Sequence, residues 1–549
     1  MSETTRVLSR VFSGERDTSR LIFFVTAMVC LLIFLTQNQA NLRAFGCDSF
    51  GYARQAELIR DKGPIGGLDT KFDNQEARQL VRVARSVHAD SSNWSEAIAP
   101  HCHHYEKATG QVILQYPPGT GMVLALFPES LALAYVFIIG MTLVAAAYAM
   151  HFARHRAAWP ATVLAVVALC LLAWTMAQNM ALASASIPVT VSIVPLAAAL
   201  SFVAFPGSHA AARPVPALAF GLLCGLLLSV RLPNVFLLIG FATQIVLTMR
   251  LWRLSAIANC LPALLLAFAG FCATGLLPVL AANLINAGGI FSTTYSPIDA
   301  SPPVLQWSLI LENLGYYFKT GFAAPALIGA CAILVFRLAT GKHCPAGDGV
   351  FGASIGALVA LTVSLAFFAT HSIRIPYYLL PASVLVLCMV AFEFMGSGKP
   401  DSIESGLGSR WLVLFLPILF VALVRLGQVT PYTPKVLLPQ EVKSENAIVW
   451  ADLNSGTVIY YQNKYAAKLN FAGDEIQDKL IDAFSDLGWT QYFIVDSPSM
   501  QAIHSRLSGT RKLAQSGVFN AQSAYPIWKL EPEKAPGKNT ESLPLPGAD

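Results

Sequence analysis

The sequence predicts a polytopic α-helical membrane protein that carries a small α/β domain near its C-terminus. Of its 549 residues, 55% are hydrophobic and only 13% are charged, whereas about 25% of the residues of an average soluble domain are charged. Long apolar stretches recur up to about residue 430, and the segment that follows has the composition of a soluble domain. These two observations exclude a soluble protein as the class of the whole chain.

Apolar stretches long enough to cross about 30 Å of hydrocarbon as helices define a transmembrane domain over residues 20–429. We expect about eleven such helices, and twelve or thirteen if short runs such as Met122 to Phe127 also enter the membrane. The candidates are 20–37, 130–152, 158–175, 188–205, 217–230, 234–251, 256–281, 321–338, 352–370, 376–395 and 411–427. A polar tail at 1–19 precedes the first stretch, so this stretch is not a cleavable signal.

The distribution of Lys and Arg among the short loops predicts the orientation. If the N-terminus is cytoplasmic, the short outer connections hold only Arg231, Lys319 and Arg374, whereas the N-terminal tail and the inner loops hold thirteen Lys and Arg residues. Positive charge favours the cytoplasmic side, so the first long loop (38–129) and the C-terminus are predicted outside. For a bacterial inner membrane this is the periplasm. The net charge of +5 mostly reflects this asymmetry and indicates no nucleic-acid partner.

The first outer loop contains two predicted helices. The first begins after Asp48 or Ser49 as N-cap and stops at Gly63-Pro64. The second begins at Asp73, and its apolar face is predicted to rest on the bilayer. Its opposite face carries Arg78, Arg82 and Arg85, which could bind phosphates or form an ordinary solvated basic face.

Two of the ten cysteines, Cys47 and Cys102, fall in this outer loop, whereas the others fall in apolar stretches or inner loops. Two thiols in an oxidising compartment can form a disulfide. The sequence leaves two alternatives: a disulfide between Cys47 and Cys102, or two free thiols.

Residues 430–530 are predicted to form a soluble α/β domain, and 531–549 a disordered tail. The patterns AIVW (447–450), TVIYY (457–461), QYFIVD (491–496) and YPIWKL (525–530) predict strands, and 476–487 predicts an amphipathic helix. No nucleotide phosphate loop, G-x-S-x-G or HExxH pattern occurs. A nucleotide-sugar or ATP-driven mechanism therefore lacks support.

Five short motifs follow one another through the outer loops. They are D-x-x-x-Y at Asp48 to Tyr52, YPPGT at Tyr116 to Thr120, RLPN at Arg231 to Asn234, N-x(4)-G…T-x-Y-S at Asn283 to Ser296, and R-x-x-Y-Y-L-L-P at Arg374 to Pro381. In this order, over about residues 20 to 430, the chain resembles the GT-C superfamily. It is most similar to bacterial polyprenyl-phosphate-sugar-dependent transferases, relatives of the protein mannosyltransferases and the lipid A aminoarabinose transferase.

The resemblance implies a GT-C fold and an integral membrane glycosyltransferase. Its partners would be a polyprenyl-phosphate-linked sugar donor, membrane lipid and an envelope acceptor: a glycolipid, a polysaccharide or a protein. The acidic residue of the first outer loop maps onto Asp48, which would act as general base in an inverting displacement. Its alternative role is the N-cap of its own helix.

The leaving phosphate needs positive charge, and Arg can bind two of its oxygens at once. The resemblance makes Arg374 the first candidate, because its motif lies beside the donor in the family. Arg231, Lys319, Arg82 and Arg85 are the others. Residues expected to line the cleft are Tyr52, Tyr116, Asn283, Tyr295, His371 and Tyr377.

The segment PHCHHYE (100–106) raises the question of a divalent metal ion, which some GT-C enzymes hold near the first-loop carboxylate. His101, His103 and Glu106 are the candidate ligands. Consecutive residues do not easily surround one ion, so a polar loop is the alternative, and no cofactor is certain.

Two other functions remain as alternatives. A transporter or sugar-lipid flippase would have ionisable residues near mid-membrane and internal repeats, and the predicted spans contain almost no charge. A non-catalytic envelope assembly scaffold would explain the soluble domain but not the ordered outer-loop motifs.

Overall fold

The computed structural model describes residues 47–72, 74–87, 97–127, 185–207, 211–292, 294, 305–319, 349–395, 438–443, 446–520 and 523–531. These residues divide into two compact units. Unit 1 contains the described residues of Gly51–Thr70 and Gln115–Thr433, and unit 2 those of Phe45–Phe50, Lys71–Leu114 and Pro434–Asp549. The first loop and the C-terminal domain were predicted as separate parts, whereas residues 71–114 belong to the same unit as the C-terminal domain.

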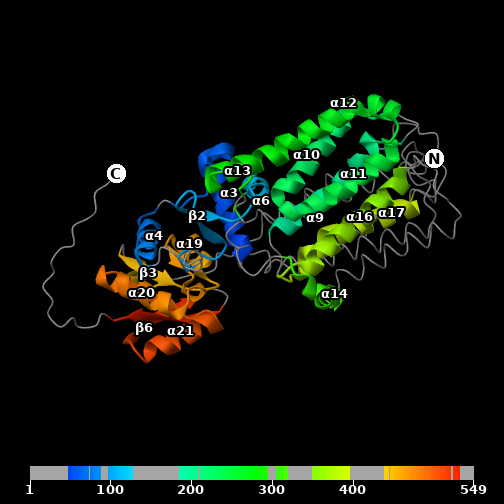
Figure 1. The fold of residues 1–549 in the computed structure, drawn as a ribbon. Coiled ribbons are helices and arrows are strands. Elements are labelled where there is room, and N and C mark those ends of the chain that lie inside the picture. Colours follow the sequence, from blue (N-terminus) through cyan, green and yellow to red (C-terminus); the bar gives the residue numbers. More distant parts are fainter. Residues whose placement is uncertain are drawn as a thin grey trace, which may run out of the picture. The chain divides into compact units, whose positions relative to one another are not determined.

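Unit 1 is built from apolar helices that run alongside one another (Figure 1). Its long helices are α9 (Ser186–Ala204), α10 (Pro214–Val230), α11 (Val235–Met249), α12 (Leu254–Phe271), α13 (Leu277–Ala287), α16 (Gly349–Thr370) and α17 (Leu380–Met395). Among the described residues, three apolar stretches are long enough to cross a membrane: Leu232–Met249, Leu254–Ala287 and Phe351–Thr370. Apolar helices are thus confirmed at six predicted spans, namely the four from 188–205 to 256–281 together with 352–370 and 376–395.

The other predicted spans (20–37, 130–152, 158–175, 321–338 and 411–427) lie outside the described residues, and the orientation stays a prediction. The run Met122 to Phe127 overlaps a short helix, α6 (Gly119–Ala125). The predicted span 256–281 is longer than expected, because α12 continues through a π-helical turn, η4 (Cys272–Leu276), into α13. Pro278 lies at the start of α13, and a missing proline N–H is compatible with such a local change of helix type.

Small residues let the helices of unit 1 approach closely. A methyl group on Gly240 would lie 2.5 Å from the carbonyl oxygen of Gly356, where α11 packs on α16. Close backbone approach at glycine is a common way for helices to pack in a bilayer, where lipid supplies little hydrophobic drive between them. Replacing either glycine by a larger residue must push these two helices apart.

Unit 2 contains a mixed five-stranded sheet in the order β4-β3-β5-β7-β6. Strands β3 (Ala447–Trp450), β4 (Ala466–Ala467) and β5 (Thr490–Ile494) are parallel, whereas β7 (Ala524–Leu530) is antiparallel to β5 and to β6 (Leu513–Asn520). Successive residues of β3 alternate between two hydrophobic cores, as a strand buried on both faces requires. A separate hairpin pairs β1 (His103–Glu106) with β2 (Gln111–Leu114).

The predicted amphipathic helix of the first loop is α4 (Gln75–Val87), but it does not present its apolar face to lipid. Ala77, Leu80, Val83 and Ala84 are buried in the core that also contains Leu480 and Phe484 of α20 (Asp474–Asp486). The helix starts one residue later than predicted, with the side chain of Asn74 accepting a hydrogen bond from Ala77 N at 2.8 Å. The prediction of an amphipathic helix is confirmed, whereas the prediction that its apolar face rests on the bilayer is wrong.

The segment TVIYY was predicted as a strand and is helix α19 (Ser455–Gln462). The Asp496 carboxylate accepts hydrogen bonds from Asp452 N at 3.0 Å and from Asn454 N at 2.6 Å, which hold the turn that starts this helix. Tertiary contacts therefore override the strand propensity of Val, Ile and Tyr. The other predicted strands and the helix at 476–487 are present, whereas α21 (Pro498–Ser508) and β6 were not predicted.

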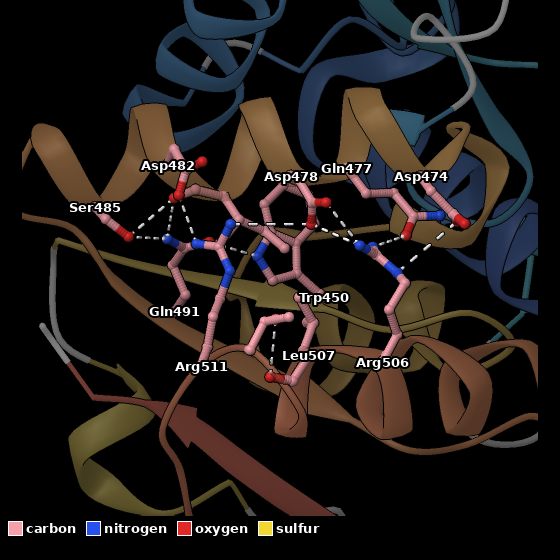
Figure 2. Close-up of polar contacts among 12 residues, drawn as sticks. Trp450, Asp474, Gln477, Asp478, Asp482, Ser485, Gln491, Arg506, Leu507 and Arg511 are labelled. Atoms are coloured by element: carbon pink, nitrogen blue, oxygen red, sulfur yellow. Dashed lines mark hydrogen bonds and ion pairs between the residues drawn. The ribbon is translucent and has the colours of Figure 1, made fainter.

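A network of ion pairs joins α20 to α21 and the turn after it (Figure 2). Arg506 binds both carboxylate oxygens of Asp478 at 2.7 Å and Gln477 Oε1 at 2.7 Å. Arg511 donates to Asp482 Oδ1 at 2.5 Å. These arginines are neutralised by carboxylates of the fold itself.

A buried ion pair between Lys464 and Glu76 gives a testable stability effect. The two groups lie 2.6 Å apart, and their side chains are 4% and 16% exposed. Glu76→Gln leaves the Lys464 ammonium in the core without its anion, so we expect it to lower the free energy of unfolding of unit 2 by about 3–5 kcal/mol. Denaturant unfolding of the full chain in detergent, followed by the fluorescence of buried Trp450, measures the loss.

The matched control is Glu475→Gln, which breaks the exposed Lys479 pair at 2.6 Å. Exposed pairs contribute about 0–1 kcal/mol. Equal losses for the two variants would contradict the assigned role of burial.

Candidate active site

The YPPGT motif packs against the RLPN motif in unit 1. Thr120 Oγ1 donates to the carbonyl oxygen of Val230 at 3.1 Å, directly before Arg231. A methyl group on Gly119 would lie 2.4 Å from Ser229 Oγ, so glycine is required for this approach. Two motifs separated by more than a hundred residues therefore meet at the C-terminal end of α10.

The tyrosine of the first motif lies against the same loop. The rings of Tyr52 and Tyr116 are 4.4 Å apart between centroids, and both are buried. One turn after Tyr52 in α3 (Cys47–Gly66), Gln55 accepts a hydrogen bond from Gly121 N at 3.2 Å and donates to Tyr116 O at 3.4 Å. Gln55 thus joins α3 to both ends of the YPPGT turn.

The fourth motif joins this arrangement from α13. Thr294 Oγ1 donates to Gln115 O at 2.9 Å, next to the YPPGT turn. Asn283 Nδ2 donates to Ile290 O at 3.2 Å and so shapes the turn after α13. Its role is structural support of the loop, and the predicted cleft residue Tyr295 lies outside the described residues.

Arg231 lies at the meeting point of these motifs and is 8% exposed. Its backbone is extended, which ends α10 before the 3₁₀ turn η3 (Leu232–Asn234). Its guanidinium carbon lies 4.7 Å from the ring centroid of Tyr378 and 5.9 Å from that of Tyr377, both in the fifth motif. Among the described residues no carboxylate pairs with it. A buried arginine with aromatic neighbours and no counter-ion is costly to keep charged.

The aromatic wall around Arg231 continues into α14 (Ile310–Lys319) and the end of α16. Tyr317 is fully buried, and burial raises the pKa of its hydroxyl. His371 lies 6.0 Å from Tyr378 between ring centroids. Asn313 Nδ2 donates to Ala369 O at 2.8 Å and His371 O at 2.9 Å, which fixes the loop after α16. Tyr377 thus lies beside Arg231 and His371 beside Tyr378, whereas their role in lining a cleft stays a prediction.

Arg374 and Lys319 are less suited to a phosphate than Arg231. Arg374 forms an ion pair with Glu312, and its side chain is 38% exposed. Lys319, at the end of α14, is exposed. A guanidinium already neutralised by a carboxylate attracts a phosphate less strongly. The resemblance ranks Arg374 first, whereas burial and the Glu312 pair favour Arg231, and the choice between them stays a prediction.

Asp48 lies in the first turn of α3, which begins at Cys47. It is thus a residue of the helix and does not precede it as the predicted N-cap. Its side chain lies outside the described part of the structure. Asp48 belongs to unit 2, whereas Arg231 belongs to unit 1, so its role as general base stays a prediction.

The candidate metal ligands do not come together. Among the described residues, no three His, Cys, Asp or Glu side chains are placed to hold a metal ion. His103 and Glu106 are three residues apart in β1 and so point to opposite faces of the strand. The His103 ring lies against Phe72 at 4.9 Å between centroids, and Glu106 accepts from Ala108 N at 3.0 Å. The set His101, His103 and Glu106 is therefore not proposed as a metal site.

Cys102 is in a disulfide bond, whereas the cysteines described as free are Cys224, Cys260, Cys272 and Cys388. The side chain of Cys47 lies outside the described residues, but Cys47 belongs to the same unit as Cys102. Their pairing stays a prediction.

His104 predicts a pH effect on stability. It is fully buried, and neither ring nitrogen has a hydrogen-bond partner among the described residues. Burial together with nearby Lys468 lowers its pKa from 6.5 to about 4. Between these values the unfolded chain takes up a proton that the folded chain does not. We therefore expect His104 to reduce the stability of unit 2 as the pH falls from 6.5 to 4.

The comparison with His104→Leu measures this effect, because Leu removes the titrating group. We expect the melting temperature of the variant to fall less than that of the natural chain between pH 6.5 and 4. Burial raises the pKa of Asp496, which acts in the opposite direction in both proteins and cancels in the comparison. If the melting temperatures of the variant and the natural chain fall by the same amount between pH 6.5 and 4, the prediction is contradicted.

Several residues of this arrangement were not predicted from the sequence. Gln55, Thr120, Tyr317 and Tyr378 make the contacts that bring the motifs together. Thr120 and Tyr378 lie inside predicted motifs, so membership of those motifs is the sequence signal that could have identified them. Gln55 and Tyr317 have no pattern that distinguishes them from ordinary helix residues.

No family model matches the chain, and no curated protein matches it. Two solved structures of ArnT from Cupriavidus metallidurans are similar to it. The structure bound to undecaprenyl phosphate has 13% sequence identity and a TM-score of 0.49, over 93% of this chain and 97% of that chain. The apo structure has 13% identity and a TM-score of 0.45, over 93% of this chain and 98% of that chain.

Proposed function

We propose that the chain is an integral membrane glycosyltransferase that moves a sugar from a polyprenyl-phosphate donor to an envelope acceptor. The observation that carries the proposal is Arg231, a buried guanidinium beside Tyr378 with no carboxylate partner among the described residues. Thr120 of the YPPGT motif binds the carbonyl oxygen of Val230 directly before it, and Tyr377 of the fifth motif packs on its guanidinium.

Arg231 is proposed to bind the donor phosphate. A lipid-linked sugar phosphate is a diester with one negative charge, and the lipid phosphate that leaves is a monoester with a second ionisable oxygen. Charge therefore grows on the phosphate as the bond to the sugar breaks. A preorganised cation in a site of low dielectric stabilises this growing charge more than it stabilises the bound donor.

Asp48 is proposed as the general base. It takes the proton of an acceptor hydroxyl as the acceptor oxygen attacks the anomeric carbon. The bond between this carbon and the phosphate oxygen breaks, and its electrons leave with the polyprenyl phosphate. A single displacement inverts the anomeric centre. The acceptor is a glycolipid, a polysaccharide or a protein.

The proposed reaction takes place on the periplasmic face of an inner membrane, with a cytoplasmic N-terminus and a periplasmic C-terminus. This orientation is supported by the Lys and Arg distribution of the loops.

Transfer from two labelled donors tests the function. Purified protein in detergent is mixed with an envelope extract and either a polyprenyl-phosphate sugar or the nucleotide form of the same sugar. We expect label to enter an acceptor from the lipid donor only. Transfer from the nucleotide sugar alone would overturn the donor assignment. Label that crosses a vesicle membrane without transfer would support a flippase, and neither event would support a scaffold.

A further inference from the structure

Unit 2 contains a pocket that the proposed function does not use. It lies between α4 and the β1–β2 hairpin and has a volume of about 260 Å³. Pockets for whole drug-sized ligands usually measure about 300–1,000 Å³, so this one suits a headgroup or a single sugar phosphate. Its lining residues are Phe72, Ala77, Arg78, Val81, Arg82, Arg85, Gly110, Gln111 and Val112.

All the charged residues that line the pocket are positive. Arg78, Arg82 and Arg85 follow one another along α4 at spacings of four and three residues, which places them on one side of the helix. No Asp or Glu is among the lining residues. Like charges at these spacings destabilise a helix by about 0.2–0.5 kcal/mol per pair. The arrangement is therefore unfavourable for the helix alone and becomes favourable when an anion lies between the guanidinium groups.

The guanidinium groups are held in place by neighbours that are neutral. Arg85 donates to the hydroxyl of Tyr105, and its guanidinium carbon lies 5.5 Å from the ring centroid of that tyrosine. Arg82 donates to Gln79 Oε1 at 3.3 Å. Gly110 has a positive φ of 68°, and a methyl group there would lie 3.0 Å from Arg85 Nη2. These contacts orient the two arginines without cancelling their charge.

Other arginines of unit 2 show the contrast. Arg506 and Arg511 pair with Asp478 and Asp482 on α20, as Figure 2 shows. Among the described residues, no carboxylate pairs with Arg82 or Arg85. The acidic side chain nearest in sequence, Glu76, pairs with Lys464 instead. The fold thus neutralises Arg506 and Arg511 and leaves Arg82 and Arg85 without a carboxylate partner among the described residues.

We propose that this pocket binds a phosphate ester, with its oxygens on Arg82 and Arg85 and its organic part against Phe72 and Val81. Arginine binds phosphate through paired N–H donors, and the apolar lining favours a ligand that is more than an inorganic ion. The ester is carried either by an anionic lipid headgroup or by a soluble sugar phosphate. The pocket belongs to unit 2, so the inference stands whether or not Arg231 binds the donor.

Protection against phenylglyoxal, which modifies arginine, tests the proposal on the full chain. Peptide mass spectrometry follows Arg82 and Arg85, with exposed Arg253 as internal control. In detergent, we expect glucose 1-phosphate to slow modification of Arg82 and Arg85 at least about fivefold, and glucose to have no effect. In nanodiscs, phosphatidylglycerol in phosphatidylcholine gives the same protection if the source is a lipid headgroup. Protection by neither probe, or equal protection of Arg253, overturns the proposal.

Two variants, one inside the pocket and one outside it, give an independent result. R82Q/R85Q removes two exposed guanidinium groups, and we expect glucose 1-phosphate affinity, measured by calorimetry, to fall at least about tenfold. Lys107→Gln removes an exposed positive charge from the β1–β2 turn that does not line the pocket, and its affinity should be unchanged. For a lipid ligand, the two variants are compared by how much phosphatidylglycerol slows the phenylglyoxal modification of Arg78. Equal effects of the two changes, with circular dichroism showing both folded, overturn the proposal.

Discussion

Replacing Asp48 by Asn is expected to lower the rate of sugar transfer by about 100- to 10,000-fold, the usual contribution of a general base. Asn keeps the size of the side chain and its ability to hydrogen-bond at a helix start, but it cannot take the acceptor proton at neutral pH. The single-turnover rate with a polyprenyl-phosphate sugar measures the chemical step. The donor dissociation constant should stay close to that of the natural chain, because the base acts on the acceptor.

Glu57→Gln is the control for this experiment. Glu57 lies on the same helix, α3, and pairs with Arg54 at 2.6 Å. The Glu57→Gln substitution removes one carboxylate from this helix but no residue of the proposed reaction, so transfer should proceed at nearly the natural rate. If Asp48→Asn also transfers sugar at nearly the natural rate, Asp48 is a structural residue of the first turn and the base lies elsewhere.

Replacing Arg231 by Gln is expected to lower kcat/KM for the lipid donor by about 10- to 100-fold, which corresponds to about 1.5–3 kcal/mol for a charge-assisted hydrogen bond. The turnover number should fall more than the donor affinity, because charge grows on the phosphate as it leaves. Arg231→Lys keeps the charge but loses paired donors and should recover only part of the activity. Steady-state kinetics with varied donor separate the two parameters.

Arg374→Gln separates the two arginine candidates. Arg374 is paired with Glu312 and is more exposed than Arg231, so we expect a smaller loss of kcat/KM. A larger loss for Arg374→Gln than for Arg231→Gln would restore the order of candidates that the resemblance implied. It would also show that the Glu312 pair opens when the donor binds.

The apolar helices were predictable because their signal is local and strong. A run of twenty apolar residues admits few structures other than a helix, and the helices from α9 to α13 and α16 to α17 occur where the runs predict them. The strand β3 was predictable for a similar reason, because AIVW is short, apolar and rich in residues that favour strands.

The errors come from contacts that are distant in sequence. An amphipathic pattern shows that one face of α4 is covered but not what covers it, and α20 lies about four hundred positions later in the chain. The segment TVIYY has strand propensity, yet contacts from Asp496 hold the turn before it as the start of a helix. Neither partner can be identified from the local sequence.

The site shows the same division. The motifs could be found in the sequence, but the choice between Arg231 and Arg374 depends on burial and on Glu312. A charged residue at the end of an apolar run can lie in the interface or turn inward, and the sequence is the same in both cases. Glu312 and Arg374 are sixty-two positions apart, so their ion pair leaves no local pattern.

The most direct test of the central claim measures the two products of one reaction together. Purified protein is given a polyprenyl-phosphate sugar labelled in the sugar and an envelope extract, and mass spectrometry quantifies both the free polyprenyl phosphate and the glycosylated acceptor. The account predicts that the two products appear in equal amounts and that Arg231→Gln reduces both together. Acceptor glycosylation without release of polyprenyl phosphate would contradict it.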